Sequence, residues 1–209
     1  MNNWTKIVLI IIGIIISLII FNIYFNRNPK RSIPLGSNIV SPADGIIGRI
    51  IDINNETAIE KGILGKIKTA CSDVAKECIL VQIIMRPWDV HVQRSPITGI
   101  IESVEYKKGF FRNAVKDAKD MRVIDNEKNE ILIKNKIMKI KVIQIAGVLA
   151  RRIECFVKPT DKIIKGQSIG KIKLGSQVSL ILPKERIIII AHEGEKVYAG
   201  ESIIGTYQE

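Results

Sequence analysis

The chain has 209 residues, 46% of them hydrophobic, 25% charged and 5% aromatic, and it carries a formal net charge of +11. This composition excludes the disordered, collagen-like and disulfide-rich classes, and the length leaves room for one sizeable core or two small ones. Three cysteines (Cys71, Cys78 and Cys155) without a C-x-x-C pair favour a reducing compartment, and the two histidines are too few for a typical zinc cage.

The first predicted element is an apolar helix near the N-terminus. Residues 7–25 contain no charged side chain, and at 1.5 Å per residue they would span about 28 Å, close to the thickness of a bilayer's hydrocarbon core. Trp4 and Tyr24 lie near the ends, as interfacial aromatic residues do. The alternative is a cleaved signal peptide, but no small-residue cleavage motif follows the apolar run. The sequence therefore predicts an uncleaved membrane anchor over residues 1–31.

The charges that flank the anchor predict its orientation. Lys6 precedes the apolar run, whereas Arg27, Lys30 and Arg31 follow it. Because the more positive flank usually stays in the cytoplasm, we expect the domain to lie on the cytoplasmic side of the cell membrane. A basic domain held at a bilayer suggests contact with anionic headgroups. No nucleic-acid-binding motif accompanies the basic charge, so nucleic acid is not expected as a partner.

Beyond the anchor, the sequence is typical of a β-rich protein. Short runs of isoleucine and valine are separated by Gly, Pro, Asn and Asp, which favours strands joined by turns. A repeat that matches residues 161–169 with 195–203 predicts two hairpins similar to those of the barrel-sandwich biotinyl and lipoyl domains. Residues 111–122 are the best candidate for a short helix or an ordered loop. We therefore expect one mainly β domain over residues 32–209, with strands within residues 45–53, 79–85, 131–133, 137–145 and 187–190.

Four short segments carry the candidate chemistry. They are Ser41–Gly45 (SPADG), residues 86–96 (RPWDVHVQRSP), residues 147–152 (GVLARR) and residues 173–178 (KLGSQV). Each is weak alone, because Gly-Ser is a common dipeptide and SPADG is typical of an ordinary turn. The second segment contains His91, one of the two histidines of the chain.

The neighbours of His91 leave two candidates for the group that orients it. If residues 86–93 form a strand, Asp89, His91 and Gln93 share one face, and the alternate residues, Trp88 among them, face the core. Asp89 is then a candidate to hold the imidazole, as a carboxylate does in a catalytic triad. Asp44 is the other candidate.

Taken together and in this order, the segments resemble the phosphatidylserine decarboxylase family, and its shorter, archaetidylserine decarboxylase-like members in particular. The resemblance includes Tyr24–Pro29 (YFNRNP), Pro42–Gly45 (PADG), Val90–Val92 (VHV) and the Gly175–Ser176 pair. It implies an enzyme that converts phosphatidylserine or archaetidylserine to the ethanolamine phospholipid and CO₂. It also implies a covalent pyruvoyl group as the electron sink, with neither pyridoxal phosphate nor a metal.

The resemblance further implies that the chain cuts itself between Gly175 and Ser176. The products would be a β chain (1–175) and an α chain (176–209) from one precursor. The Ser176 hydroxyl would attack the Gly175 carbonyl, and elimination from the resulting ester would convert Ser176 into the pyruvoyl group. His91 would act as the base.

The matching positions also suggest roles for other residues. Asp44 corresponds to the family's motif aspartate, so we prefer it to Asp89 as the partner of His91. Many bacterial-type relatives carry a second histidine three residues after the first, where this chain has Arg94. That departure leaves open whether His91 serves self-cleavage, decarboxylation or both.

Two pairs of residues are candidates for substrate contact. Arg151 and Arg152 would bind the phosphate or carboxylate of the substrate. Phe110 and Phe111 follow two lysines, which suits a loop that dips into an anionic bilayer, although packing in the core is an equal alternative.

Two other functions compete with the decarboxylase. A membrane-anchored lipoyl-barrel adaptor without catalysis also joins an anchor to such a domain, but it usually inserts a long helical hairpin, and no heptad run is present here. An inactive family member is disfavoured because Asp44, His91, Gly175 and Ser176 are all retained. A homodimer is compatible with the sequence but is not indicated by it.

Overall fold

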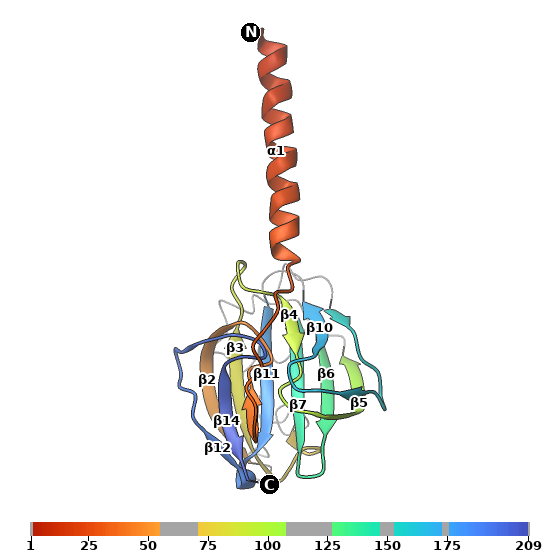
Figure 1. Cartoon of the computed structure of the whole chain (residues 1–209), viewed down its shortest axis with the longest axis vertical. Helices are drawn as coiled ribbons and strands as arrows, with labels where there is room; N and C mark the ends of the chain where they lie inside the picture. Colours follow the sequence, from red (N-terminus) through yellow and green to blue (C-terminus); the bar gives the residue numbers. More distant parts are fainter. Residues whose placement is uncertain (1, 55–70, 108–126, 147–152, 173–175, 209) are drawn as a thin grey trace.

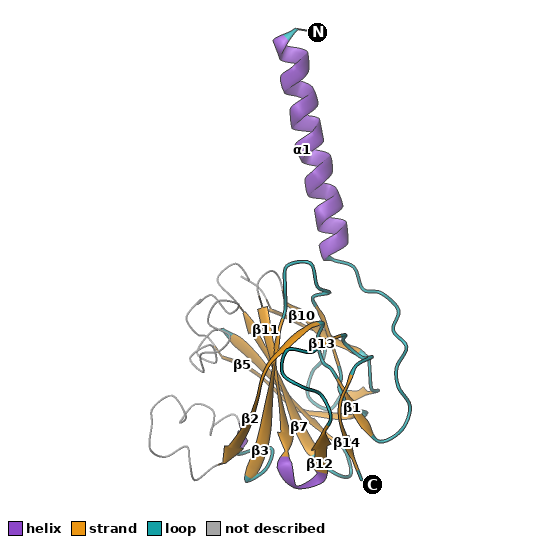
Figure 2. Ribbon diagram, turned by 90° about the vertical axis from the view of Figure 1, so that its left-hand side faces the viewer, coloured by secondary structure: helices purple, strands orange, loops and turns teal. Residues whose placement is uncertain are grey.

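The computed structural model describes residues 2–54, 71–107, 127–146, 153–172 and 176–208. One helix, α1 (Asn3–Phe25), stands apart from a body built of strands (Figures 1 and 2). A mainly β domain with an N-terminal helix is therefore confirmed. The candidate helix at residues 111–122 lies outside the described residues.

α1 is long and apolar enough to cross a membrane. It begins after Asn2, whose side chain accepts a hydrogen bond from the Thr5 N–H at 2.9 Å and so caps the first turn. All of its side chains are exposed except that of Phe25. Because such a surface is unfavourable in water, the helix is suited to a lipid environment.

The described strands form three sheets, and every pairing between these strands is antiparallel. The largest sheet has eight strands in the order β13 (Lys196–Val197), β2 (Gly45–Asn54), β3 (Glu77–Ile84), β11 (Ser176–Pro183), β7 (Lys139–Ala146), β6 (Lys128–Lys134), β5 (Gly99–Lys107) and β9 (Lys162–Ile163). The two three-stranded sheets are β1 (Asn38–Val40), β14 (Ile203–Tyr207) and β12 (Ile187–Ile189), and β4 (Val92–Arg94), β10 (Ser168–Ile172) and β8 (Ile153–Cys155). A 3₁₀ turn, η3 (Lys184–Arg186), joins β11 to β12.

The alternation of side chains along these strands builds two apolar clusters. The larger lies on one face of the eight-stranded sheet and includes Val81, Val142 and Leu180 from three neighbouring strands. Leu80 and Ile181 point to the other face and belong to the second cluster. All five strand-forming runs predicted from the sequence lie in or overlap described strands.

The repeat detected in the sequence is a pair of equivalent hairpins, as predicted. Strands β9 and β10 are joined through Gly166, and β13 and β14 through Gly200. The two glycines have φ of 82° and 78°, a left-handed conformation that residues with a Cβ rarely adopt. Ile33 packs against both, and a Cβ on Gly166 would lie 2.3 Å from its Cδ1 atom.

The structure also contains a second repeat, which the sequence analysis did not detect. The turn at Ser41–Gly45 (SPADG) is equivalent to the turn at Ser95–Gly99 (SPITG). The Gly200 N–H donates to the Ser41 carbonyl and the Gly166 N–H to the Ser95 carbonyl, each at 2.8 Å. Each turn therefore binds one of the two hairpins, so the body is built from two related halves.

One local prediction is wrong. Residues 86–93 do not form a continuous strand, because β3 ends at Ile84 and a turn covers residues 87–89 before β4. Pro87 has no N–H to donate to a sheet. The Asp89 carboxylate accepts from the Arg86 N–H at 2.8 Å and stabilises the turn. Trp88, expected in the core, is 57% exposed.

Candidate active site

His91 lies immediately before β4 and is completely buried. Its Nδ1 atom is 2.8 Å from the main-chain oxygen of Asp89. Because a carbonyl only accepts, Nδ1 carries the proton, and a neutral ring then has a basic lone pair at Nε2. Nε2 is buried and has no hydrogen-bond partner among the described residues. Burial lowers the pKa of His91, and the Asp89 carbonyl partly opposes this effect.

A series of hydrogen-bonded, buried amide side chains leads away from the His91 main chain. Gln93 donates to the His91 carbonyl at 3.0 Å, and Gln144 donates to the Gln93 side chain at 2.8 Å. Asn129 donates to Gln144 at 2.9 Å. A Cβ on Gly170 would lie 2.4 Å from the Gln144 amide, so glycine is needed there. Sequence reasoning missed this network, whose only signal was polar amides within apolar strands.

Ser176 is connected to this region by a short stretch of chain. The Ile172 N–H at the end of β10 donates to the His91 carbonyl at 3.1 Å. Ser176 is the first residue of β11, and its backbone pairs with Ala146 of β7. With three residues between them, Ile172 and Ser176 are at most about 14 Å apart between Cα atoms. Gly175 itself lies outside the described residues. Figure 1 shows β4, β10 and β11 below the foot of α1.

Neither candidate carboxylate hydrogen-bonds the His91 ring in the described structure. Asp44 accepts two hydrogen bonds from Arg31, at 2.8 and 2.9 Å, and one from the Ala199 N–H at 2.8 Å. The carboxylate of Asp89 is bound to Arg86, and only its main-chain oxygen contacts the ring. A role for Asp44 beside His91 therefore stays a prediction.

The two related halves explain part of what Asp44 does. Thr98 occupies the equivalent place in the other half, and its hydroxyl accepts from the Lys165 N–H at 3.0 Å. Asp44 holds the matching hairpin in the same way, through Ala199. Its additional partner is Arg31, which also binds Glu201 at 2.9 Å. Asp44 thus joins one turn, one hairpin and the segment that follows α1.

Arg94 stands where the resemblance led us to look for a second histidine. It donates to the Gly166 carbonyl at 2.8 Å, to the Asn28 side chain at 2.5 Å and to the Pro29 carbonyl at 2.9 Å. It therefore connects the segment after α1 to the hairpin of β9 and β10.

The foot of α1 contacts the site directly. The centroid of the Phe25 ring is 4.3 Å from that of His91. Tyr24 and Arg27 both donate to the main-chain oxygen of Trp88, at 3.4 and 2.6 Å. These contacts place the end of the helix over the turn that carries His91.

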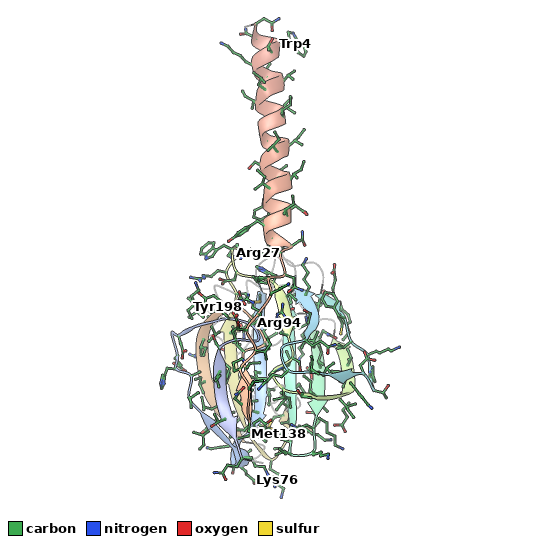
Figure 3. The ribbon with its side chains drawn as sticks, viewed as in Figure 1. Trp4, Arg27, Lys76, Arg94, Met138 and Tyr198 are labelled. Carbon is green, nitrogen blue, oxygen red and sulfur yellow. The ribbon has the colours of Figure 1, made fainter. Side chains whose placement is uncertain are left out.

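Aromatic and cationic side chains gather around this end of the body. The Arg86 guanidinium is 5.5 Å from the Trp88 ring, and the Lys196 ammonium is 5.0 Å from the Tyr198 ring. Figure 3 shows Arg27 at the base of the helix, Trp4 at its far end and Tyr198 in the upper part of the body. We call Trp88, Tyr198 and their paired cations the aromatic rim.

The remaining predicted site residues, Phe110, Phe111, Arg151 and Arg152, lie outside the described residues. Ile153, which follows Arg152 in the chain, begins β8 and pairs with Ile172. Within the described residues, no group of three or more histidine, cysteine or acidic side chains is placed to hold a metal.

Comparison with known proteins assigns the chain to a class of decarboxylases, which are carboxy-lyases. The profile of the phosphatidylserine decarboxylase family matches residues 18–205. A phosphatidylserine decarboxylase proenzyme from Carboxydothermus hydrogenoformans is 38% identical over 197 residues, covering 93% of this chain and 84% of the relative. A putative archaetidylserine decarboxylase proenzyme from Methanocaldococcus jannaschii is 39% identical over 190 residues, covering 90% of each. This chain belongs to the phosphatidylserine decarboxylase family, and the adaptor alternative is set aside.

Proposed function

We propose that the protein is a self-processing, pyruvoyl-dependent decarboxylase of a phospholipid with a serine headgroup, either phosphatidylserine or archaetidylserine. Its products would be the ethanolamine lipid and CO₂. Membership of the family and the names of its relatives support this proposal. The observation that carries it is the buried Nε2 of His91, which has no partner among the described residues, in a histidine whose main chain accepts from Ile172, four residues before Ser176.

In the proposed self-cleavage, His91 Nε2 takes the proton from the Ser176 hydroxyl. The oxygen attacks the Gly175 carbonyl carbon, the peptide C–N bond breaks, and the proton passes to the released amine, leaving an ester. Removal of the Cα proton of residue 176 then breaks the ester C–O bond and frees the Gly175 carboxylate. Uptake of one water and loss of one ammonia leave a ketone carbonyl at position 176.

The pyruvoyl group would supply an electron-withdrawing carbonyl that accepts the electron pair left when CO₂ departs. Ser176 would be its source and would hold it covalently at the start of β11. A neutral His91 fits beside such a group, because its free nitrogen can hold or deliver a proton without bringing a charge into a buried site. We further propose that Arg151 and Arg152 bind the phosphate or carboxylate of the lipid.

The membrane arrangement completes the proposal. α1 would anchor the chain, and residues 32–209 would form the catalytic domain on the cytoplasmic side. The aromatic rim then lies at headgroup level, where amphipathic rings and cations are favoured. Phe110 and Phe111 would enter the same layer. The lipid headgroup would reach the site without leaving the bilayer surface.

Intact mass spectrometry of the purified protein tests the cleavage. We expect two chains, residues 1–175 and 176–209, the smaller of about 3.8 kDa at the mean residue mass of the chain. Their masses should sum to that of the precursor plus one water minus one ammonia. The smaller chain should resist Edman sequencing and react with borohydride or hydrazine. Release of CO₂ from vesicles containing either lipid identifies the substrate.

The matched variants are Ser176→Ala and Ser179→Ala, two serines of the same strand. Ser176→Ala should remain a single chain without activity, because the attacking oxygen is gone. Ser179→Ala should still cleave. An active wild-type enzyme that is one uncut chain, or a free serine amine on the small fragment, would disprove the pyruvoyl proposal.

A further inference from the structure

The membrane helix ends on the proposed catalytic histidine. Phe25, the last residue of α1, is 6% exposed, whereas the other described side chains of the helix are all exposed. Its ring is inclined at 36° to the His91 ring, with 4.3 Å between centroids. Phe21, one turn earlier, stacks on Phe25 at 5.9 Å. The helix therefore closes over the imidazole with an apolar ring.

The contact is held in place from both sides. Tyr24 and Arg27, on either side of Phe25 in the chain, donate to the Trp88 carbonyl at 3.4 and 2.6 Å. On the body side, the Asp89 carbonyl fixes His91 Nδ1 at 2.8 Å. A rigid aromatic face on a fixed imidazole excludes water from the ring more effectively than a mobile side chain would.

We propose that Phe25 is a positioning residue of the active site: its ring keeps His91 dry and correctly oriented, so that the membrane anchor is part of the catalytic apparatus as well as a tether. This inference rests on the proposed function in taking His91 as the base. It differs from simple anchoring because an exposed residue of α1 holds the bilayer equally well without touching the imidazole.

Electrostatics at the ring agree with this role. Burial is the main cause of the lowered pKa of His91. Among the described residues, the charged groups that act on the ring are Asp89 on its own turn, Arg27 after α1 and Lys171 of β10. Asp89 favours the protonated ring, and the two cations disfavour it. Removing the Phe25 ring would admit water and raise the pKa towards its ordinary value of 6.5.

The first test follows His91 directly in the full-length chain. In the uncleaved Ser176→Ala protein, with His192→Gln removing the second histidine, ¹⁵N-histidine NMR in detergent micelles gives the titration of His91. Phe25→Ala should raise its midpoint, Phe25→Leu should raise it less, and Phe25→Tyr should leave it near the parent value. The control is Ile23→Ala on the same helix, a residue that is 68% exposed; it should change nothing.

The second test measures self-cleavage against pH in chains that retain Ser176. Because only neutral His91 can act as the base, a raised midpoint moves the acidic limb of the rate profile to higher pH. At a pH below the His91 midpoints of both the parent and Phe25→Ala, a midpoint that is one pH unit higher in the variant should lower its cleavage rate about tenfold relative to the parent. The rate of the variant should recover at alkaline pH. Phe25→Tyr should restore the parent profile.

An unchanged His91 titration in both Phe25→Ala and Phe25→Leu would overturn the inference. So would a cleavage rate reduced equally at every pH, because that is the result of looser packing alone. If the wild-type chain did not cleave itself, the proposed function would fail first, and the NMR titration would still decide whether Phe25 controls the environment of His91.

Discussion

At the scale of single residues, the proposed site depends on a neutral His91 ring with one nitrogen available as a base. Burial lowers the pKa of His91 and so favours the neutral ring, although the Asp89 carbonyl partly opposes this effect. That carbonyl holds the proton on Nδ1, and among the described residues nothing hydrogen-bonds Nε2. The cost of protonating a buried ring also links the site to the stability of the whole fold.

This linkage gives a prediction for His91→Gln. The folded-state pKa of His91 is lowered, so the unfolded chain binds the proton first as the pH falls through about 6.5. Stability of the wild-type precursor should therefore decrease from pH 7 to pH 5. In thermal melts of the Ser176→Ala protein, His91→Gln should make the stability depend less on pH.

The same substitution should also affect self-cleavage. In the chain that retains Ser176, His91→Gln should slow self-cleavage at least about 100-fold. Arg94→Ala should impair cleavage less. Normal processing of His91→Gln would exclude His91 as the base.

Asp44 can be tested against its own structural equivalent. Thr98 holds the matching hairpin with a hydroxyl, so Asp44→Thr should keep the bond to the Ala199 N–H. It leaves the buried Arg31 with Glu201 alone, which should cost about 3 kcal/mol of unfolding free energy. Denaturant unfolding and the cleavage rate of Asp44→Thr and Asp44→Asn measure the two effects. If Asp44 acts chemically, both variants should cleave slowly. Wild-type cleavage rates in a destabilised Asp44→Thr chain would show a structural role only.

At the scale of elements, the segment between α1 and β1 is packed as part of the body. It runs from the foot of the helix along the strands to β1 (Figure 2). Asn28, Arg31 and Ile33 contact Arg94, Asp44 and the two hairpin glycines in turn. Residues 28–31, assigned to the anchor from the sequence, therefore make contacts that the domain uses.

Two truncations separate the anchor from this segment. A chain that starts at Arg27 loses α1 but keeps Asn28 and Arg31, so it should be soluble and fold. A chain that starts at Ser32 leaves the buried Asp44 without its cation and should melt at a lower temperature. Carbonate and salt extraction measure membrane binding, and residual binding of the shorter chains should be salt-sensitive. Resistance of the Arg27 chain to both treatments would contradict α1 as the main anchor.

The elements that could be predicted are those with a local signal. The charge-free run over residues 7–25 and the Gly-centred repeats each specify their structure within a few neighbouring residues. Pro87 was also a usable signal against a strand, but the alternation around His91 outweighed it in the prediction. The contacts Phe25–His91 and Gln144–Gln93 join residues distant in sequence, so no periodic pattern could reveal them.

At the scale of the whole molecule, the motifs were sufficient to indicate the family, because the short segments follow one another along this chain in the same order as in members of the family. Their arrangement in space was not predictable in the same way. Asp44 and His91 were paired by motif, yet in the fold Asp44 binds Arg31, whereas the ring faces Phe25 and a main-chain oxygen.

The central place of β11 has a consequence for the lifetime of the enzyme. β11 pairs with β3 and with β7 along most of its length, and β12 and β14 belong to a different sheet. A cut before Ser176 would leave a short chain that supplies strands to both. Refolding of the uncut precursor is a unimolecular process, whereas a cut protein would have to rebind its separated chain in a bimolecular step. If the chain cuts itself as proposed, denaturation of the mature protein would be effectively irreversible, and the lifetime of the enzyme would be set by its rate of unfolding.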